Sequence, residues 1–170
     1  MQDRGKRIRR PLSRIVLVCE SVDRPDPRHG PGGDAHFDET KGQASSPPIP
    51  SPKRKKVALV DDDVLVRTVF EKVLTYNGFE VMASMSDGDE IVKSIDGMST
   101  KPDVVIMDER MPRMSGVEAC RIIHSRYPEI RIIFVSADES AKDRASDAGA
   151  CGFLSKPLST SDLIFALNSV

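Results

Sequence analysis

Cysteine is scarce in this 170-residue sequence, and no apolar run is long. The three cysteines, Cys19, Cys120 and Cys151, are odd in number and follow no metal-binding or redox-motif spacing, so neither a disulfide framework nor a zinc site is expected. The apolar run Ile15–Cys19 is far shorter than the roughly 7 to 15 residues of a signal-peptide core, and nothing approaches the roughly 20 of a membrane span. We therefore expect a cytoplasmic protein that is neither exported nor held in a membrane.

Basic charge is lacking in the second part of the chain. Residues 57–170 hold 12 Lys or Arg against 19 Asp or Glu, whereas residues 1–56 hold 13 against 7. Phosphate contacts require a basic face, so an acidic folded part argues against direct DNA binding.

Apolar periodicity is missing from residues 1–52, where eight of the 12 prolines lie. Such a segment cannot bury a face, so it is predicted to be a disordered, Pro/Gly-rich extension. Its one apolar patch, Ile15–Val18, is expected to pair at most transiently. The basic run Lys53–Lys56 is interpreted as the solvated beginning of a folded domain that spans residues 53–170.

Short apolar runs and amphipathic stretches alternate from Val57 onward. Strands are predicted at 56–60, 79–84, 103–107, 131–135 and 152–155, and helices at 63–77, 87–97, 115–126, 139–148 and 159–169. Such an alternation requires a parallel sheet with helices on both faces. The predicted fold is a single doubly wound α/β domain with five parallel strands, of the flavodoxin-like (βα)5 type.

Polar side chains follow four of these five strands. They are Asp61, Asp62 and Asp63 after the first strand, Asp108 after the third, Ser136 after the fourth and Lys156 after the fifth. The carboxyl ends of parallel strands form one edge where ligands bind, so these groups are expected to converge. Crowded carboxylates need a cation, and oxygen ligands suit Mg²⁺. Lys156 and Ser136 are then placed to hold phosphoryl oxygens by charge and by a hydrogen bond.

Four motifs in this order resemble the response-regulator receiver domain of two-component signalling. They are "ALVDDD", "VVIMDERMPRMSG", "FVSAD" and "GFLSKPLS", and the resemblance covers about Lys55 to Val170. It implies that Asp108 accepts a phosphoryl group from a sensor histidine kinase or a phosphotransfer protein. It also implies that Asp62, Asp108 and the backbone carbonyl of Arg110 ligate Mg²⁺, with Asp61 acting mainly through a metal-bound water.

The acidic triplet is assigned by its place in the chain. Asp61 and Asp62 directly follow the apolar strand and are taken as the acidic pair, while Asp63 is interpreted as the N-cap of the next helix. The family usually holds the bond between Lys156 and Pro157 cis, which favours a functional place for this lysine.

The resemblance also implies a switch, in which Ser136 moves toward the phosphoryl group and Phe153 turns inward. A pair of Arg110 with Asp138 across the mouth of the site is hypothesised to hinder water and prolong the phosphorylated state. Because no output domain follows Val170, the expected output is binding to a downstream effector protein.

Two alternatives remain open. A metal-dependent hydrolase with an aspartyl nucleophile needs an acid two residues after the nucleophile, and Arg110 stands there, so turnover is not expected beyond self-catalysed phosphoryl acceptance and autodephosphorylation. A receiver-like module that binds partners without being phosphorylated is the second alternative.

Overall fold

The computed structural model describes residues 15–17 and 53–170. The strands are β1 (Ile15–Leu17), β2 (Lys56–Val60), β3 (Glu80–Met85), β4 (Val104–Asp108), β5 (Arg131–Ser136) and β6 (Gly152–Ser155). The helices are α1 (Val64–Tyr76), α2 (Gly88–Gly97), α3 (Gly116–Arg126), α4 (Ala141–Asp147) and α5 (Thr160–Ser169). The predicted disorder of residues 1–52 lies outside the described residues, except at Ile15–Leu17, which form a strand.

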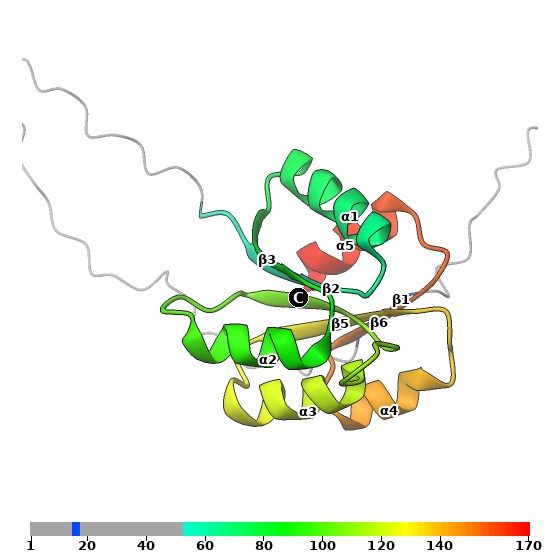
Figure 1. Cartoon of the computed structure of the whole chain (residues 1–170). Coiled ribbons are helices and arrows are strands. Elements are labelled where there is room, and N and C mark those ends of the chain that lie inside the picture. Colours follow the sequence, from blue (N-terminus) through cyan, green and yellow to red (C-terminus); the bar gives the residue numbers. More distant parts are fainter. Residues whose placement is uncertain (1–14, 18–52) are drawn as a thin grey trace, which may run out of the picture. The chain divides into compact units, whose positions relative to one another are not determined.

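One sheet has the strand order β1-β6-β5-β4-β2-β3. Strands β2 to β6 pair in parallel, which confirms the predicted doubly wound fold, and β1 adds an antiparallel sixth strand that was not predicted. Helices α1 and α5 cover one face of the sheet, and α2, α3 and α4 cover the other (Figure 1). Right-handed crossovers between parallel strands place helices on both faces in this way.

The core has two parts because the central strands are buried on both faces. Along β2, Val57 and Leu59 join the cluster that faces α1 and α5, while Ala58 and Val60 join the cluster that faces α2, α3 and α4. All five residues of β4 are buried, including the terminal Asp108. This arrangement carries the acid to the edge of the core without exposing it.

Capping residues set the beginnings of the helices. The predicted N-cap Asp63 is confirmed, since its carboxylate accepts from the backbone N–H groups of Leu65 and Val66. Helix α4 is shorter than predicted, and its N-cap residue Ser140 makes no capping side-chain hydrogen bond. Helix α4 therefore has a weaker start than its neighbours.

The two cysteines in the described residues, Cys120 and Cys151, are both buried. Burial raises the pKa of the Cys120 thiol to about 12, so a reactive thiolate is not available there. Cys19 lies outside the described residues. Within 15–17 and 53–170, no helix combines the length and the apolar character that crossing a membrane requires.

Candidate functional site

One ammonium group joins two strand ends. The Lys156 Nζ donates to Asp61 Oδ2 over 2.9 Å and to Asp108 Oδ1 over 2.7 Å. Asp61 follows β2, Asp108 ends β4 and Lys156 follows β6, so the predicted convergence at the carboxyl edge of the sheet is found for these three residues. Both acids are buried, with only 5% of Asp61 and 8% of Asp108 exposed. Charges this well shielded from water interact strongly.

The remaining oxygens of the two carboxylates are held by their own loops. Asp61 Oδ1 accepts from the backbone N–H of Asp63 over 2.9 Å, and Asp108 Oδ2 accepts from that of Arg110 over 2.7 Å. The Arg67 guanidinium donates to the backbone carbonyl of Asp61 from the first turns of α1. Arg67 was not among the predicted site residues, because its helical position looks like that of an ordinary surface residue.

The electrostatics of the site disfavour the ionised form of Asp108, the predicted phosphoryl acceptor. Burial raises the pKa of Asp108 and the charge of Asp61 adds to that effect, while the hydrogen bond and charge of Lys156 oppose it without cancelling it. Burial lowers the pKa of Lys156, but its bonds to Asp108 and Asp61 outweigh burial and leave that pKa raised. Burial therefore dominates the pKa of Asp108, and the shared lysine offsets it only in part.

Ser136 ends β5, between the strands that bear Asp108 and Lys156. Its hydroxyl oxygen accepts from the backbone N–H of Asp138 over 3.1 Å, and its carbonyl accepts from the backbone N–H of Lys156 over 2.8 Å. The residue is buried, with 2% of its surface exposed. The structure thus places Ser136 at the same edge as the ammonium group.

The three acids expected at the metal do not gather as one cluster. Asp61 lies beside Asp108 through their shared lysine, whereas Asp62 is exposed. Among residues 15–17 and 53–170, no three His, Cys, Asp or Glu side chains are grouped as metal ligands. Mg²⁺ generally needs only one or two carboxylates beside waters and phosphate oxygens, so Asp61 and Asp108 fit its chemistry.

A buried acid that was not among the predicted site residues directly follows Asp108. Glu109 is 4% exposed, and its Oε1 lies 3.1 Å from Nη1 of Arg144 on α4. The Arg144 Nη2 also lies 3.7 Å from Asp138 Oδ2. In the described part of the chain, Asp138 is therefore paired with Arg144, and the expected pair with Arg110 is not formed, because α4 brings its arginine closer.

A second acidic cluster holds the loop after β4. The buried Asp87 carboxylate accepts from the backbone N–H groups of Arg113 over 2.9 Å and Met114 over 3.0 Å. The Arg113 guanidinium lies 2.9 Å from Asp89 and 2.6 Å from Glu90. These bonds fix the loop that connects β4 to α3.

Close packing fixes the start of α3 against Asp108. A side-chain carbon at Gly116 would come within 2.2 Å of the Asp108 carbonyl oxygen, so no larger residue fits there without displacing the backbone. The Gly116 N–H donates to the Glu109 carbonyl over 2.9 Å. The expected cis bond between Lys156 and Pro157 is confirmed.

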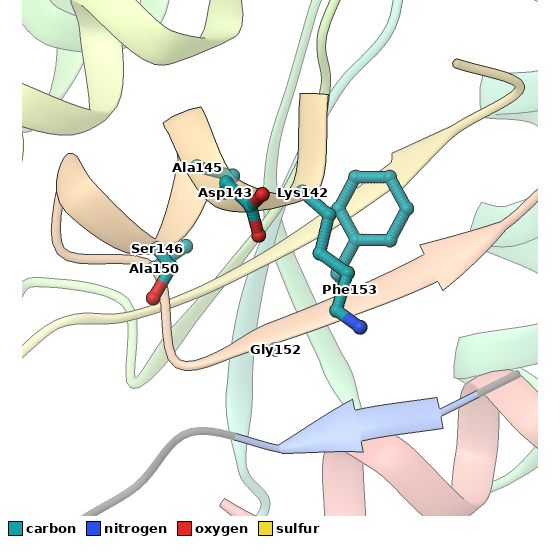
Figure 2. Close-up of a pocket in the computed structure, with 7 residues that line it drawn as sticks. All are labelled: Lys142, Asp143, Ala145, Ser146, Ala150, Gly152 and Phe153. Atoms are coloured by element: carbon teal, nitrogen blue, oxygen red, sulfur yellow. The ribbon is translucent and has the colours of Figure 1, made fainter. Parts of the chain in front are cut away.

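Phe153 lies in β6 and is buried, with 5% exposed. It lines a cavity of about 140 Å³ between β6 and α4, together with Lys142, Asp143, Ala145, Ser146, Ala150 and Gly152. Figure 2 shows the ring extending from β6 beside the residues of α4. The structure thus gives the predicted switch aromatic free space on the α4 side.

The fold and this site define a doubly wound α/β protein whose acids and lysine meet at the carboxyl edge of a parallel sheet. The model of the response regulator receiver domain family matches residues 57–168. The chain belongs to this family, and its relatives are response regulators of two-component signalling.

Two curated relatives come from mycobacteria. The chain is 37% identical over 114 residues to the transcriptional regulatory protein PdtaR of Mycobacterium tuberculosis, across 66% of this chain and 55% of PdtaR. It is 33% identical over 117 residues to the response regulator MprA of Mycolicibacterium vanbaalenii, across 68% of this chain and 49% of MprA. The matched region thus spans about half the length of these relatives.

Solved structures with the same fold include chemotaxis proteins. A chain of the CheX-CheY-BeF3-Mg²⁺ complex from Borrelia burgdorferi aligns with a TM-score of 0.64 and 28% identity, over 67% of this chain and 87% of that one. CheY4 of Vibrio cholerae aligns with a TM-score of 0.63 and 29% identity, over 69% and 99% of the two chains. Both similarities extend over the region that carries the site.

Proposed function

We propose that residues 53–170 form a receiver unit that takes a phosphoryl group on Asp108 and signals by binding another protein. The donor is a sensor histidine kinase or a phosphotransfer protein, the setting is the cytoplasm, and the unit itself does not contact DNA. The observation that supports this proposal most strongly is the single Lys156 ammonium that bridges Asp61 and Asp108.

The chemistry asks mainly for positioning and for stabilisation of charge. A carboxylate oxygen of Asp108 forms a bond to phosphorus as the bond between phosphorus and the donor nitrogen breaks. Lys156 then offers its ammonium, and Ser136 its hydroxyl, to the transferred phosphoryl oxygens. The backbone N–H of Arg110 already fixes one oxygen of the acceptor, which orients the carboxylate.

Receiver domains generally bind Mg²⁺, and we assign its site here to Asp61, Asp108 and the backbone carbonyl of Arg110. The exposed Asp62 carboxylate must turn toward these groups to join them as a ligand. When bound, the ion supplies positive charge for the phosphoryl oxygens and for the crowded acids. The raised pKa of Asp108 supports this assignment, because it reflects a carboxylate in a buried and negatively charged setting.

The signal is proposed to pass from Ser136 to Phe153. Ser136 ends β5 and Phe153 lies in the neighbouring β6, paired with Phe134. The cavity beside α4 leaves room for the aromatic ring to change position. Water attack on the aspartyl phosphate then returns the protein to its starting state, so the chain acts as a switch and does not turn over a substrate.

Intact-mass measurement with Mg²⁺ and a small phosphoryl donor tests the proposal. We expect a gain of one phosphoryl group that is absent in Asp108→Asn and present in the matched variant Asp87→Asn. Continuous phosphate release from a broad range of phosphate esters would instead indicate the hydrolase. Absence of any gain, from a donor or from a kinase, would indicate a module that binds partners without phosphorylation.

A further inference from the structure

The outer edge of β6 is occupied by a strand from far away in the sequence. β6 is the last of the parallel strands, so its outward N–H and C=O groups would otherwise lack partners. β1 pairs with it in antiparallel register, with Ile15 opposite Leu154, Val16 opposite Phe153 and Leu17 opposite Gly152. Figure 1 places β1 beside β6, and Figure 2 shows the two strands running next to each other.

No short turn forces this pairing. β1 precedes β6 by more than a hundred residues, and its direction is opposite to that of the five parallel strands. α5 also lies against β1, so the segment contacts a helix as well as the sheet edge. The run "IVLVC" is rich in β-branched and apolar residues, which suits a strand. The outward N–H and C=O groups of β6 thus bind an extended segment without the help of a connecting turn.

The contact is also short. β1 has three residues, the lower limit of ordinary strand length, so its pairing is expected to be weak and reversible. An edge strand that loses its cover becomes a template for another strand, including the same edge of a second copy. The register adds a link to the switch region, because the residue opposite Val16 is Phe153.

We propose that the outer edge of β6 is a strand-docking site whose occupant is the chain's own segment Ile15–Leu17, and that this segment closes the edge against pairing with a second copy. The proposal is independent of phosphorylation, since it depends only on backbone pairing. It gives a part of the N-terminal extension a defined partner within the receiver unit.

The test uses the full chain and the double variant Val16→Pro/Leu17→Pro. Neighbouring N–H groups of a strand point to opposite sides, so one of the two prolines must remove a donor that faces β6. The matched control Ser21→Pro/Val22→Pro places the same change outside the strand. Amide hydrogen exchange of β6, resolved by NMR, is expected to be at least about tenfold faster in the variant than in the control and the unchanged chain.

Unchanged exchange in β4 will show that the variant is folded. Addition of a synthetic peptide with the sequence of residues 12–20 is expected to restore slow exchange in β6, as a docking site requires. Equal β6 exchange in all three proteins would overturn the docking site. Analytical ultracentrifugation is expected to detect dimers of the variant at concentrations where the control is monomeric, and a variant that stays monomeric would overturn the closing role.

Discussion

Two acidic clusters lie near the loop after β4, and in each of them one cation contacts every acid of the cluster. In the first, Lys156 bridges Asp61 and Asp108; in the second, Arg113 contacts Asp87, Asp89 and Glu90. Their electrostatics are opposite. Burial alone raises the pKa of Asp87, but the N–H groups of Arg113, Met114 and Asp89 and the charge of Arg113 hold it below its usual range, whereas the pKa of Asp108 is raised.

The difference indicates what each cluster is for. The carboxylate of Asp87 has its hydrogen bonds supplied by the folded chain, so it needs no further ligand and serves to fix a loop. Asp108 accepts one backbone N–H and shares its lysine with Asp61, so additional positive charge would stabilise it. A perturbed acid at a strand end is the feature that favours a functional role.

The largest expected effect is the complete loss of phosphoryl gain in Asp108→Asn, because the amide is not a nucleophile for phosphorus. Asp87→Asn is expected to keep the gain, since Asp87 holds the loop without touching the phosphoryl group. Intact mass after exposure to Mg²⁺ and a small donor checks both. Equal phosphoryl gain in the two variants would contradict the different roles assigned to Asp108 and Asp87.

The next largest difference is expected between the phosphorylation rates of variants that lose Lys156 and variants that lose Arg113. Lys156→Met deletes the charge that faces the transferred oxygens, and we expect phosphorylation to slow by on the order of 100-fold, the scale seen for loss of a preorganised charge stabiliser. Arg113→Met, which loses only the loop cluster, is expected to slow it by no more than about threefold. Stopped-flow measurement of phosphorylation under single-turnover conditions gives both rates. A rate for Lys156→Met within threefold of the unchanged protein would remove Lys156 from the mechanism.

The effects on stability should be in the opposite order: Asp87→Asn should lower the free energy of unfolding more than Asp108→Asn does. Asp87→Asn weakens charge-assisted bonds from two backbone N–H groups to a buried carboxylate, so we expect a loss of about 2 kcal/mol in the free energy of unfolding at pH 7. Asp108→Asn is expected to cost nothing or to stabilise, because the ionised acid is disfavoured by its surroundings in the folded state. Urea denaturation of both variants measures this. An equal loss in both would contradict the assignment of Asp87 as the structural acid.

The pH dependence of this difference follows from the lowered pKa of Asp87. Its folded pKa lies below its unfolded value, so its contribution is fully present above the unfolded value of about 4 and is lost as pH falls through the folded pKa. The stability gap between the unchanged protein and Asp87→Asn is therefore expected to close below about pH 4. Denaturation midpoints at pH 7, 5, 4 and 3 provide the curve, and a gap of constant size would show that the charge of Asp87 does not contribute.

Sequence reasoning found the site because strand ends in a doubly wound sheet share one edge. That rule and the regular alternation of apolar runs with amphipathic stretches predict the positions of Asp61, Asp108 and Lys156. The strand-end rule did not predict the pair of Glu109 and Arg144. In the sequence, an acid and a basic helix residue look like surface positions, and only the fold shows that α4 lies over the loop. The pairing of β1 with β6 was not predicted for another reason. The apolar patch Ile15–Val18 indicated transient pairing at most, and the edge that receives it exists only in three dimensions.

The smallest expected effect concerns a third cation that faces the acceptor loop from α4. Asp138 is paired with Arg144, so Arg144→Ala is expected to shorten the lifetime of the aspartyl phosphate by about threefold, the scale of a partly exposed ion pair. Arg110→Ala tests the earlier hypothesis of a pair with Asp138 and is expected to change the lifetime less, because Arg110 acts on Asp138 only at longer range. Decay of the phosphorylated form, followed by intact mass, gives each lifetime. A larger effect of Arg110→Ala than of Arg144→Ala would show that the partner of Asp138 changes when Asp108 is phosphorylated. Arg110 of the loop, and not Arg144 of α4, would then cover the site.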